Sequence, residues 1–167
     1  MAQELNLNVN HIVAESTNIL STNFGGGHIY SITINEDMDN GLLVCRNEYL
    51  EDETWSAKAY VEGEEPLLLL APPVMPFTEV RGYATEDKFY NKKGDRVRAY
   101  TLRVGDRISL SEMAFESAPA VGDFVTFDAG AKQYVVGEAA EGKFCAKVLS
   151  KIMRTNLIMY KLQVVSL

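Results

Sequence analysis

Residues 104–110 have the sequence Val-Gly-Asp-Arg-Ile-Ser-Leu, and residues 121–127 repeat its pattern as Val-Gly-Asp-Phe-Val-Thr-Phe. A looser third copy, Gly-Asp-Arg-Val-Arg-Ala-Tyr, occupies residues 94–100. In each copy a glycine–aspartate pair, typical of a tight turn, precedes alternating apolar and polar residues, the pattern of a half-buried strand. The second half of the chain is therefore predicted to be compact, antiparallel β structure.

Short strands are also predicted on both sides of this block. The candidate segments are residues 28–34, 42–45, 55–61, 67–70, 133–137, 144–152 and 157–165. Asp39-Asn40-Gly41 is a hairpin-turn signal, and Ser109 with Glu112 has the spacing of a capping box, which predicts one short helical turn. The predicted fold class is mainly β: an antiparallel β-barrel or sandwich of about eight to ten short strands, with one or two short helices and an extended N-terminal arm.

The beginning of the chain differs in character from the rest. Leu5, Leu7 and Val9 alternate with asparagines, a period-two pattern that suits a strand lying on a sheet edge or on a neighbouring molecule. Gly25-Gly26-Gly27 then marks a hinge between this arm and the body. The predicted organisation is an arm over residues 1–24, a β subdomain over 25–80 and a barrel-like domain over 81–167.

Composition places the chain among ordinary globular proteins, with 167 residues, 47% of them hydrophobic and 23% charged. No apolar run approaches the roughly 18–20 residues of a membrane helix, and no secretory signal is recognised at the start. Cytoplasmic synthesis is therefore expected. Cys45 and Cys145 are too few for a disulfide framework and are predicted to be buried, reduced thiols.

The net charge of −7 is unevenly distributed. Residues 36–65 carry ten carboxylates against two basic side chains, whereas five basic and no acidic side chains follow Glu141. The overall acidity argues against general nucleic-acid binding. The asymmetry is compatible with head-to-tail packing of identical subunits, acidic face to basic face. Two solvated faces without a partner are the alternative.

No residue pattern indicates a catalytic centre, a cofactor site or a metal site, and no such residue is assigned. Asp95, Asp106 and Asp123 would be a carboxylate cluster if they converged. Each follows a glycine, however, where an aspartate bonds to nearby turn amides, and a turn-forming role is predicted. His11 and His28 lack a motif for zinc or acid–base chemistry. The chain is therefore expected not to be an enzyme.

The densest basic stretch includes Arg96 and Arg98. Period-two alternation puts these two arginines on one face of a strand, with Val97 and Ala99 on the other. A subunit interface is the preferred functional interpretation of this basic face, and plain solvation is the alternative.

Residues 89–106 (FYNKKGDRVRAYTLRVGD), followed by the second Val-Gly-Asp unit at residues 121–123, resemble small proteins associated with the heads of tailed bacteriophages. The resemblance is to capsid decoration or auxiliary proteins. It covers about the last half of the chain and includes the Leu-Asn-rich start, while residues 25–76 match only in general character. The family has no catalytic residues to carry over.

The resemblance implies a non-enzymatic virion structural protein that binds the capsid exterior and stabilises the shell. Its implied location is the virion, assembled in the host cytoplasm. Its implied partners are the major capsid protein and copies of itself in a homo-oligomer, with no membrane, no direct nucleic acid and no cofactor. The candidate capsid or subunit contacts are Leu5, Leu7, Val9, Arg96 and Arg98.

Two alternatives stay open. The chain would still be a virion component as a major shell, head-fibre or host-binding protein. A small-ligand or carbohydrate-binding β domain would instead need exposed aromatic rings in a groove, with Trp55, Tyr60 and Tyr83 as candidates.

Overall fold

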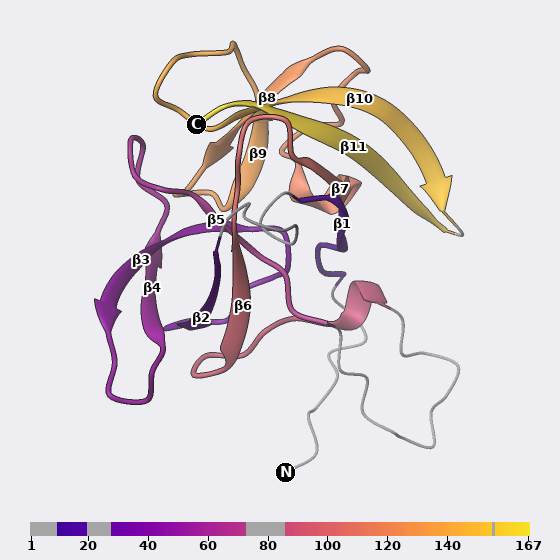
Figure 1. Ribbon diagram of the computed structural model, residues 1–167. Coiled ribbons are helices and arrows are strands. Elements are labelled where there is room, and N and C mark those ends of the chain that lie inside the picture. Colours follow the sequence, from indigo (N-terminus) through magenta and orange to yellow (C-terminus); the bar gives the residue numbers. More distant parts are fainter. Residues whose placement is uncertain (1–9, 20–27, 73–85, 155) are drawn as a thin grey trace, which may run out of the picture.

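The computed structural model describes residues 10–19, 28–72, 86–154 and 156–167. These form eleven β-strands, divided between a closed barrel and a six-stranded sheet, and two single turns of 3-10 helix (Figure 1). The mainly β expectation is confirmed, with slightly more strands than the predicted eight to ten. Within the described ranges, no helix has the length and apolar character needed to cross a bilayer.

The barrel has the strand order β2-β4-β3-β5-β6. Its strands are β2 (Ile29–Thr33), β3 (Leu43–Tyr49), β4 (Trp55–Ala59), β5 (Leu67–Leu69) and β6 (Arg96–Thr101). The β2–β4 pair is parallel, so the predicted antiparallel pairing is wrong for this pair.

The predicted hairpin at Asp39-Asn40-Gly41 is also wrong, because β2 and β3 are not neighbours in the barrel. The segment between these strands crosses the barrel end instead. It is held there by paired backbone hydrogen bonds between Met38 and Asn91, each 2.9 Å. A turn-forming sequence thus serves as a crossover, since its pairing is decided by distant strands.

The second sheet has the order β1-β7-β11-β10-β8-β9, and its described pairs are antiparallel. Its strands are β1 (Ala14–Asn18), β7 (Arg107–Ser111), β8 (Phe124–Asp128), β9 (Gln133–Val136), β10 (Cys145–Arg154) and β11 (Leu157–Ser166). The subdomain boundary predicted at residue 80 does not separate the barrel from the sheet, because β6, which follows residue 80, closes the barrel. Part of the predicted arm, β1, pairs with β7 at the sheet edge.

One hydrophobic core joins the barrel to the sheet, because buried side chains from both belong to a single cluster. Two buried hydrogen bonds cross the junction. The Tyr134 hydroxyl of β9 donates to the Gly41 carbonyl oxygen at 2.7 Å, and the Phe144 N–H donates to the Tyr60 hydroxyl at 3.0 Å. The largest fully buried side chains include Tyr134, Tyr160, Phe144, Leu67, Leu68, Leu69, Ile108 and Leu110. Barrel and sheet therefore form one body.

The three glycine–aspartate turns share one geometry. The glycines have positive φ angles of 88°, 98° and 101°, which a residue without a Cβ adopts readily. Each aspartate carboxylate accepts a hydrogen bond from the backbone N–H three residues earlier, at 2.8 Å in all three cases. The aspartates are Asp95, Asp106 and Asp123. Their predicted role as turn formers is confirmed.

The predicted helical turn is present as a 3-10 helix, η3 (Glu112–Ala114), but the predicted capping box is not. The capping position is Ser111 rather than Ser109, and it makes no side-chain cap hydrogen bond. Glu112 instead accepts a hydrogen bond from the Tyr160 hydroxyl at 2.9 Å. Its carboxylate is therefore used to tie η3 to β11.

Candidate functional site

The two candidate arginines on β6 are both exposed, while Val97 and Ala99 between and beside them are buried. The predicted alternation is confirmed. Arg96 pairs with Asp52 at 2.8 Å, whereas Arg98 lines a cleft. The arm candidates Leu5, Leu7 and Val9 lie outside the described residues.

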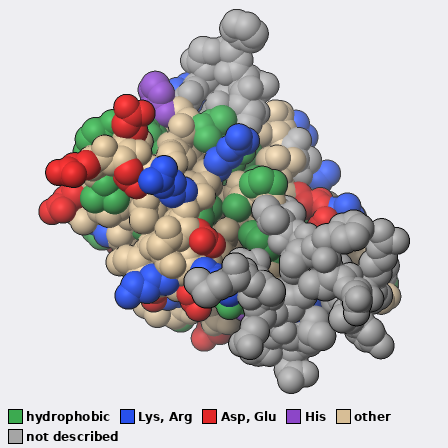
Figure 2. Space-filling model, turned by 90° about the horizontal axis from the view of Figure 1, so that it is seen from below, with side chains coloured by type: hydrophobic (Ala, Val, Ile, Leu, Met, Phe, Trp, Pro, Cys, Tyr) green, Lys and Arg blue, Asp and Glu red, His purple; other side chains and the backbone are tan. Residues whose placement is uncertain are grey.

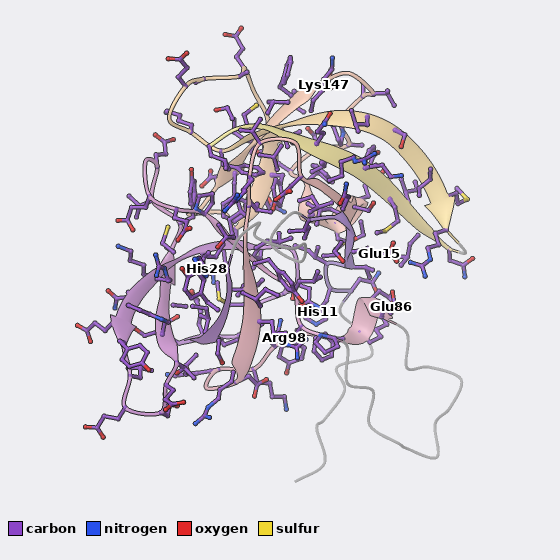
Figure 3. All side chains as sticks on the ribbon, in the orientation of Figure 1. His11, Glu15, His28, Glu86, Arg98 and Lys147 are labelled. Carbon is purple, nitrogen blue, oxygen red and sulfur yellow. The ribbon has the colours of Figure 1, made fainter. Side chains whose placement is uncertain are left out.

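The cleft beside Arg98 has a volume of about 600 Å³ and separates β6 from β1 and η2 (Glu86–Lys88). Figure 3 shows Arg98, Glu15 and Glu86 on the elements around it. Arg154, at the end of β10, forms an ion pair with Glu15 on β1. The cleft contains none of His28, Asp106 and Asp123, whose convergence would have suggested acid–base chemistry. Its mixed charges suit a polar contact surface.

Residues 10–13, just before β1, are fixed to the body by His11. Its Nδ1 lies 2.7 Å from Asp39 Oδ1, and its backbone N–H donates to the Asp87 carbonyl oxygen at 2.7 Å. The Ile12 N–H donates to Asp39 Oδ2 at 3.0 Å, and the imidazole stacks on Tyr90 with ring centroids 4.8 Å apart. This histidine anchors the chain at the start of β1.

The hairpin of β10 and β11 is the most prominent projection of the sheet, and Figure 1 shows it curving away from the other strands. Strand β8 pairs with β10 only from Cys145 to Lys147. Val148 still exchanges backbone hydrogen bonds with Gly122 and Asp123, at 2.9 and 2.8 Å, and beyond Val148 this edge of β10 has no partner strand within the described part of the chain. Ile152 and Met153 near the tip are 44% and 75% exposed. We call these two residues the apolar hairpin tip.

Sequence reasoning missed the apolar hairpin tip. One signal was available, since Ile152 and Met153 are consecutive apolar residues that interrupt strict alternation. Consecutive apolar residues on a two-faced strand require either burial on both faces or exposure of one side chain. The sequence alone does not show where partner strands end, so it leaves this choice open.

A group of unpaired cations lies on one face of the six-stranded sheet. Lys147 is opposite Gln163, Gln163 is opposite Arg107, and Lys161 is two residues from Gln163 on β11. Facing residues of paired strands share a face, as do residues two apart. Arg107, Lys147 and Lys161 therefore form a basic face. None of them makes an ion pair with a described residue, and Lys147 lies over the Phe124 ring at 5.7 Å.

A group of unpaired carboxylates lies at the far end of the barrel, where β3 turns into β4. Glu48, Glu51 and Glu53 are exposed there and form no ion pair within the described ranges. We call them the acidic tip. Tyr49 beside them is 60% exposed. Figure 2 shows acidic side chains gathered at the left edge, the side on which Figure 1 places the β3–β4 turn.

Asp52, within the same turn, is already engaged and so is separate from the acidic tip. The Thr54 hydroxyl donates to its carboxylate at 2.7 Å, and Arg96 lies 2.8 Å away. The Thr54 hydrogen bond, helped by the Arg96 charge, holds the pKa of Asp52 below its usual value. Arg96 thus stabilises the turn that carries the acidic tip.

Trp55 and Tyr60, the two described aromatic residues considered for ligand binding, line neither described cleft. Tyr60 is buried, and Trp55 packs edge-on against Tyr49 with Arg46 5.1 Å from its ring. Tyr83 lies outside the described residues. Both cysteines are free and buried, as predicted, and burial raises the pKa of each thiol, which disfavours the reactive thiolate.

No three His, Cys, Asp or Glu side chains within the described ranges are grouped to hold a metal ion. Comparison of the chain with protein-family models, curated proteins and solved structures gave no match.

Proposed function

We propose that this chain is a non-enzymatic structural protein of a phage virion, which binds the capsid exterior and stabilises the shell. Its partners would be the major capsid protein and further copies of itself. The observation that carries the proposal is the β10–β11 hairpin, a projection with an unpaired strand edge and an apolar tip.

An unpaired strand edge presents backbone N–H and C=O groups that can pair with another chain. Adjacent exposed apolar side chains favour protein partners, because their burial at an interface is stabilising. The hairpin combines both properties on one projecting element. A protein that grips other proteins needs such an element on a body that holds its shape.

Residues 89–106, which carry the family resemblance, help the body to hold its shape. Within this block, Asn91 bonds to the Met38 carbonyl oxygen at 3.1 Å, and Asp95 and Asp106 close turns. The turn glycine Gly94 donates to the carbonyl oxygen of Ile34, just after β2, at 2.9 Å, and Gly105 donates to that of Val164 on β11 at 2.8 Å. The characteristic residues of the block thus fix backbone geometry, as expected of a structural signature. Symmetric copies on a shell would add up modest individual contacts.

The position of β1 limits which N-terminal deletion can test the arm. Removing residues 1–24 would delete β1 together with Ile12, Val13 and Ile19, which are 6%, 5% and 1% exposed. Such a truncation would damage the body. Deleting residues 2–9 removes Leu5, Leu7 and Val9 and keeps the His11 anchor and β1.

We expect the double substitution Ile152→Ser and Met153→Ser to weaken binding to phage heads that lack this protein. Burial of an apolar side chain contributes about 1.5–3 kcal/mol, so the loss should be roughly tenfold or more in affinity. Co-sedimentation of purified protein with such heads measures it. Deletion of residues 2–9 is expected to weaken binding independently.

Val104→Ser is the matched control, because Val104 is a 59% exposed apolar residue on a different turn. It should bind heads as the unmodified chain does. If hairpin, arm and control variants all bind equally well, neither element contacts the shell. If the unmodified chain does not bind at all, the proposed function is wrong.

A further inference from the structure

The basic face and the acidic tip lie at opposite ends of the molecule. Figure 1 places the β3–β4 turn at the lower left, and Figure 3 places Lys147 at the top. One copy of the chain therefore cannot bring its own two charged surfaces together. Any ionic contact between them must join two copies.

Several other charged residues of the described chain form ion pairs locally, unlike those of these two surfaces. Around the barrel, Lys58 pairs with Glu64 at 2.7 Å and Arg46 with Glu65 at 2.9 Å. Lys143, just before β10, pairs with Glu62 at 2.7 Å. The basic face and the acidic tip have no such partners in the described part of the chain. Their charges remain available for an intermolecular contact.

We infer that the acidic tip of one copy docks on the basic face of the next copy. Glu48, Glu51 and Glu53 would approach Arg107, Lys147 and Lys161. Opposite potentials of this kind orient partners and determine which surfaces meet. The inference deepens the proposed function, since it assigns the contact between copies on the shell. It rests on the proposed function only for the place where the copies meet, which is the shell surface.

An exposed aromatic ring accompanies the acidic tip, since Tyr49 beside it is 60% exposed. Large aromatic side chains flanked by charged residues are typical of protein interfaces. Because the two surfaces are different, the contact is head-to-tail and produces a ring when the rotation closes.

Charge reversal tests this contact directly. At low salt, the unmodified chain should associate as its concentration rises in sedimentation velocity, and high salt should weaken the association. Glu51→Lys or Lys147→Glu alone should weaken it by at least about tenfold, because like charges then face each other. The two substitutions in one chain should restore association. Both positions are exposed, so the fold should be unaffected, which circular dichroism checks.

Glu116→Lys is the matched control, since it makes the same charge change at an exposed position outside the acidic tip. It should associate as the unmodified chain does. The inference is overturned if the unmodified chain stays monomeric, if the single reversals have no effect, or if the double reversal fails to restore association. It is also overturned if Lys147→Glu abolishes binding to duplex DNA without affecting self-association.

No shells are present in this experiment, so its outcome is separate from that of the proposed function. If the chain stays monomeric but binds heads, the head-to-tail contact is wrong and the shell role stands. If the chain associates but does not bind heads, the shell role is wrong and the head-to-tail contact stands.

Discussion

Replacing Gly41 by alanine is expected to lower the free energy of unfolding by about 2–5 kcal/mol. Gly41 has a φ of +85°, where an L-residue is strained by about 1–2 kcal/mol. A Cβ there would lie 2.7 Å from Leu110 Cδ2 and 3.0 Å from Ala14 Cβ. Overpacking of this kind costs about 1–3 kcal/mol more. Urea denaturation followed by fluorescence measures the change.

Gly63→Ala is the matched control, because Gly63 has nearly the same φ of +82° and no atom within 4 Å of the added Cβ. It should lose only the backbone contribution, about 1–2 kcal/mol. The difference between the two variants isolates the close packing between the barrel and β1 and β7. Equal losses for Gly41→Ala and Gly63→Ala would contradict this description of the junction.

Asn40→Ala is expected to have the second large effect, about 2–4 kcal/mol. Asn40 is 4% exposed; its Nδ2 donates to the Ala71 carbonyl oxygen, and its Oδ1 accepts from the Ala71 N–H, both at 2.9 Å. Its Oδ1 also accepts from Asn91 Nδ2 at 3.1 Å. Alanine would leave these groups without their partner, and each unsatisfied buried group costs about 1–3 kcal/mol.

Thermal unfolding of Asn40→Ala, Asn91→Ala and the double variant measures this network. The two single losses should not add, because the side chains share a hydrogen bond. Asn47→Ala is the control, since Asn47 is exposed on β3, and its change should stay within about 0.5 kcal/mol. Full additivity, or a loss at Asn40 no larger than at Asn47, would contradict the role of the network.

The features that local chemistry decides were predictable from the sequence. A glycine followed by an aspartate specifies a turn through a positive φ and a carboxylate that bonds to the N–H three residues back, as at Asp95, Asp106 and Asp123. Alternation on β6 likewise placed Arg96 and Arg98 on the exposed face. Neither feature depends on distant parts of the chain.

Pairing between distant segments was not predictable in the same way. The parallel contact of Ile32 with Trp55 and the closure of the barrel by β6 depend on which strands meet, which a period-two pattern does not encode. Asn40 illustrates the difference. Its sequence context indicates a hairpin turn, yet tertiary contacts bury it as the centre of a hydrogen-bond network.

The candidate contact surfaces were predictable only in outline. The charge asymmetry along the chain is visible in the sequence, with acidic residues at 36–65 and basic residues after Glu141. Which charges remain available depends on pairing in the fold, since Glu64 and Lys143 are neutralised while Glu51 and Lys147 are not. The apolar hairpin tip needed the structure, because its exposure follows from where β8 stops pairing.

The proposed role is tested most directly by imaging phage heads that were prepared without the protein and then incubated with it. Cryo-electron microscopy should show added density of this size at symmetry-related positions on the outer surface of the shell, with the β10–β11 hairpin in contact with shell subunits. Heads that remain bare at saturating protein, or density confined to the interior or the tail, would contradict the proposal.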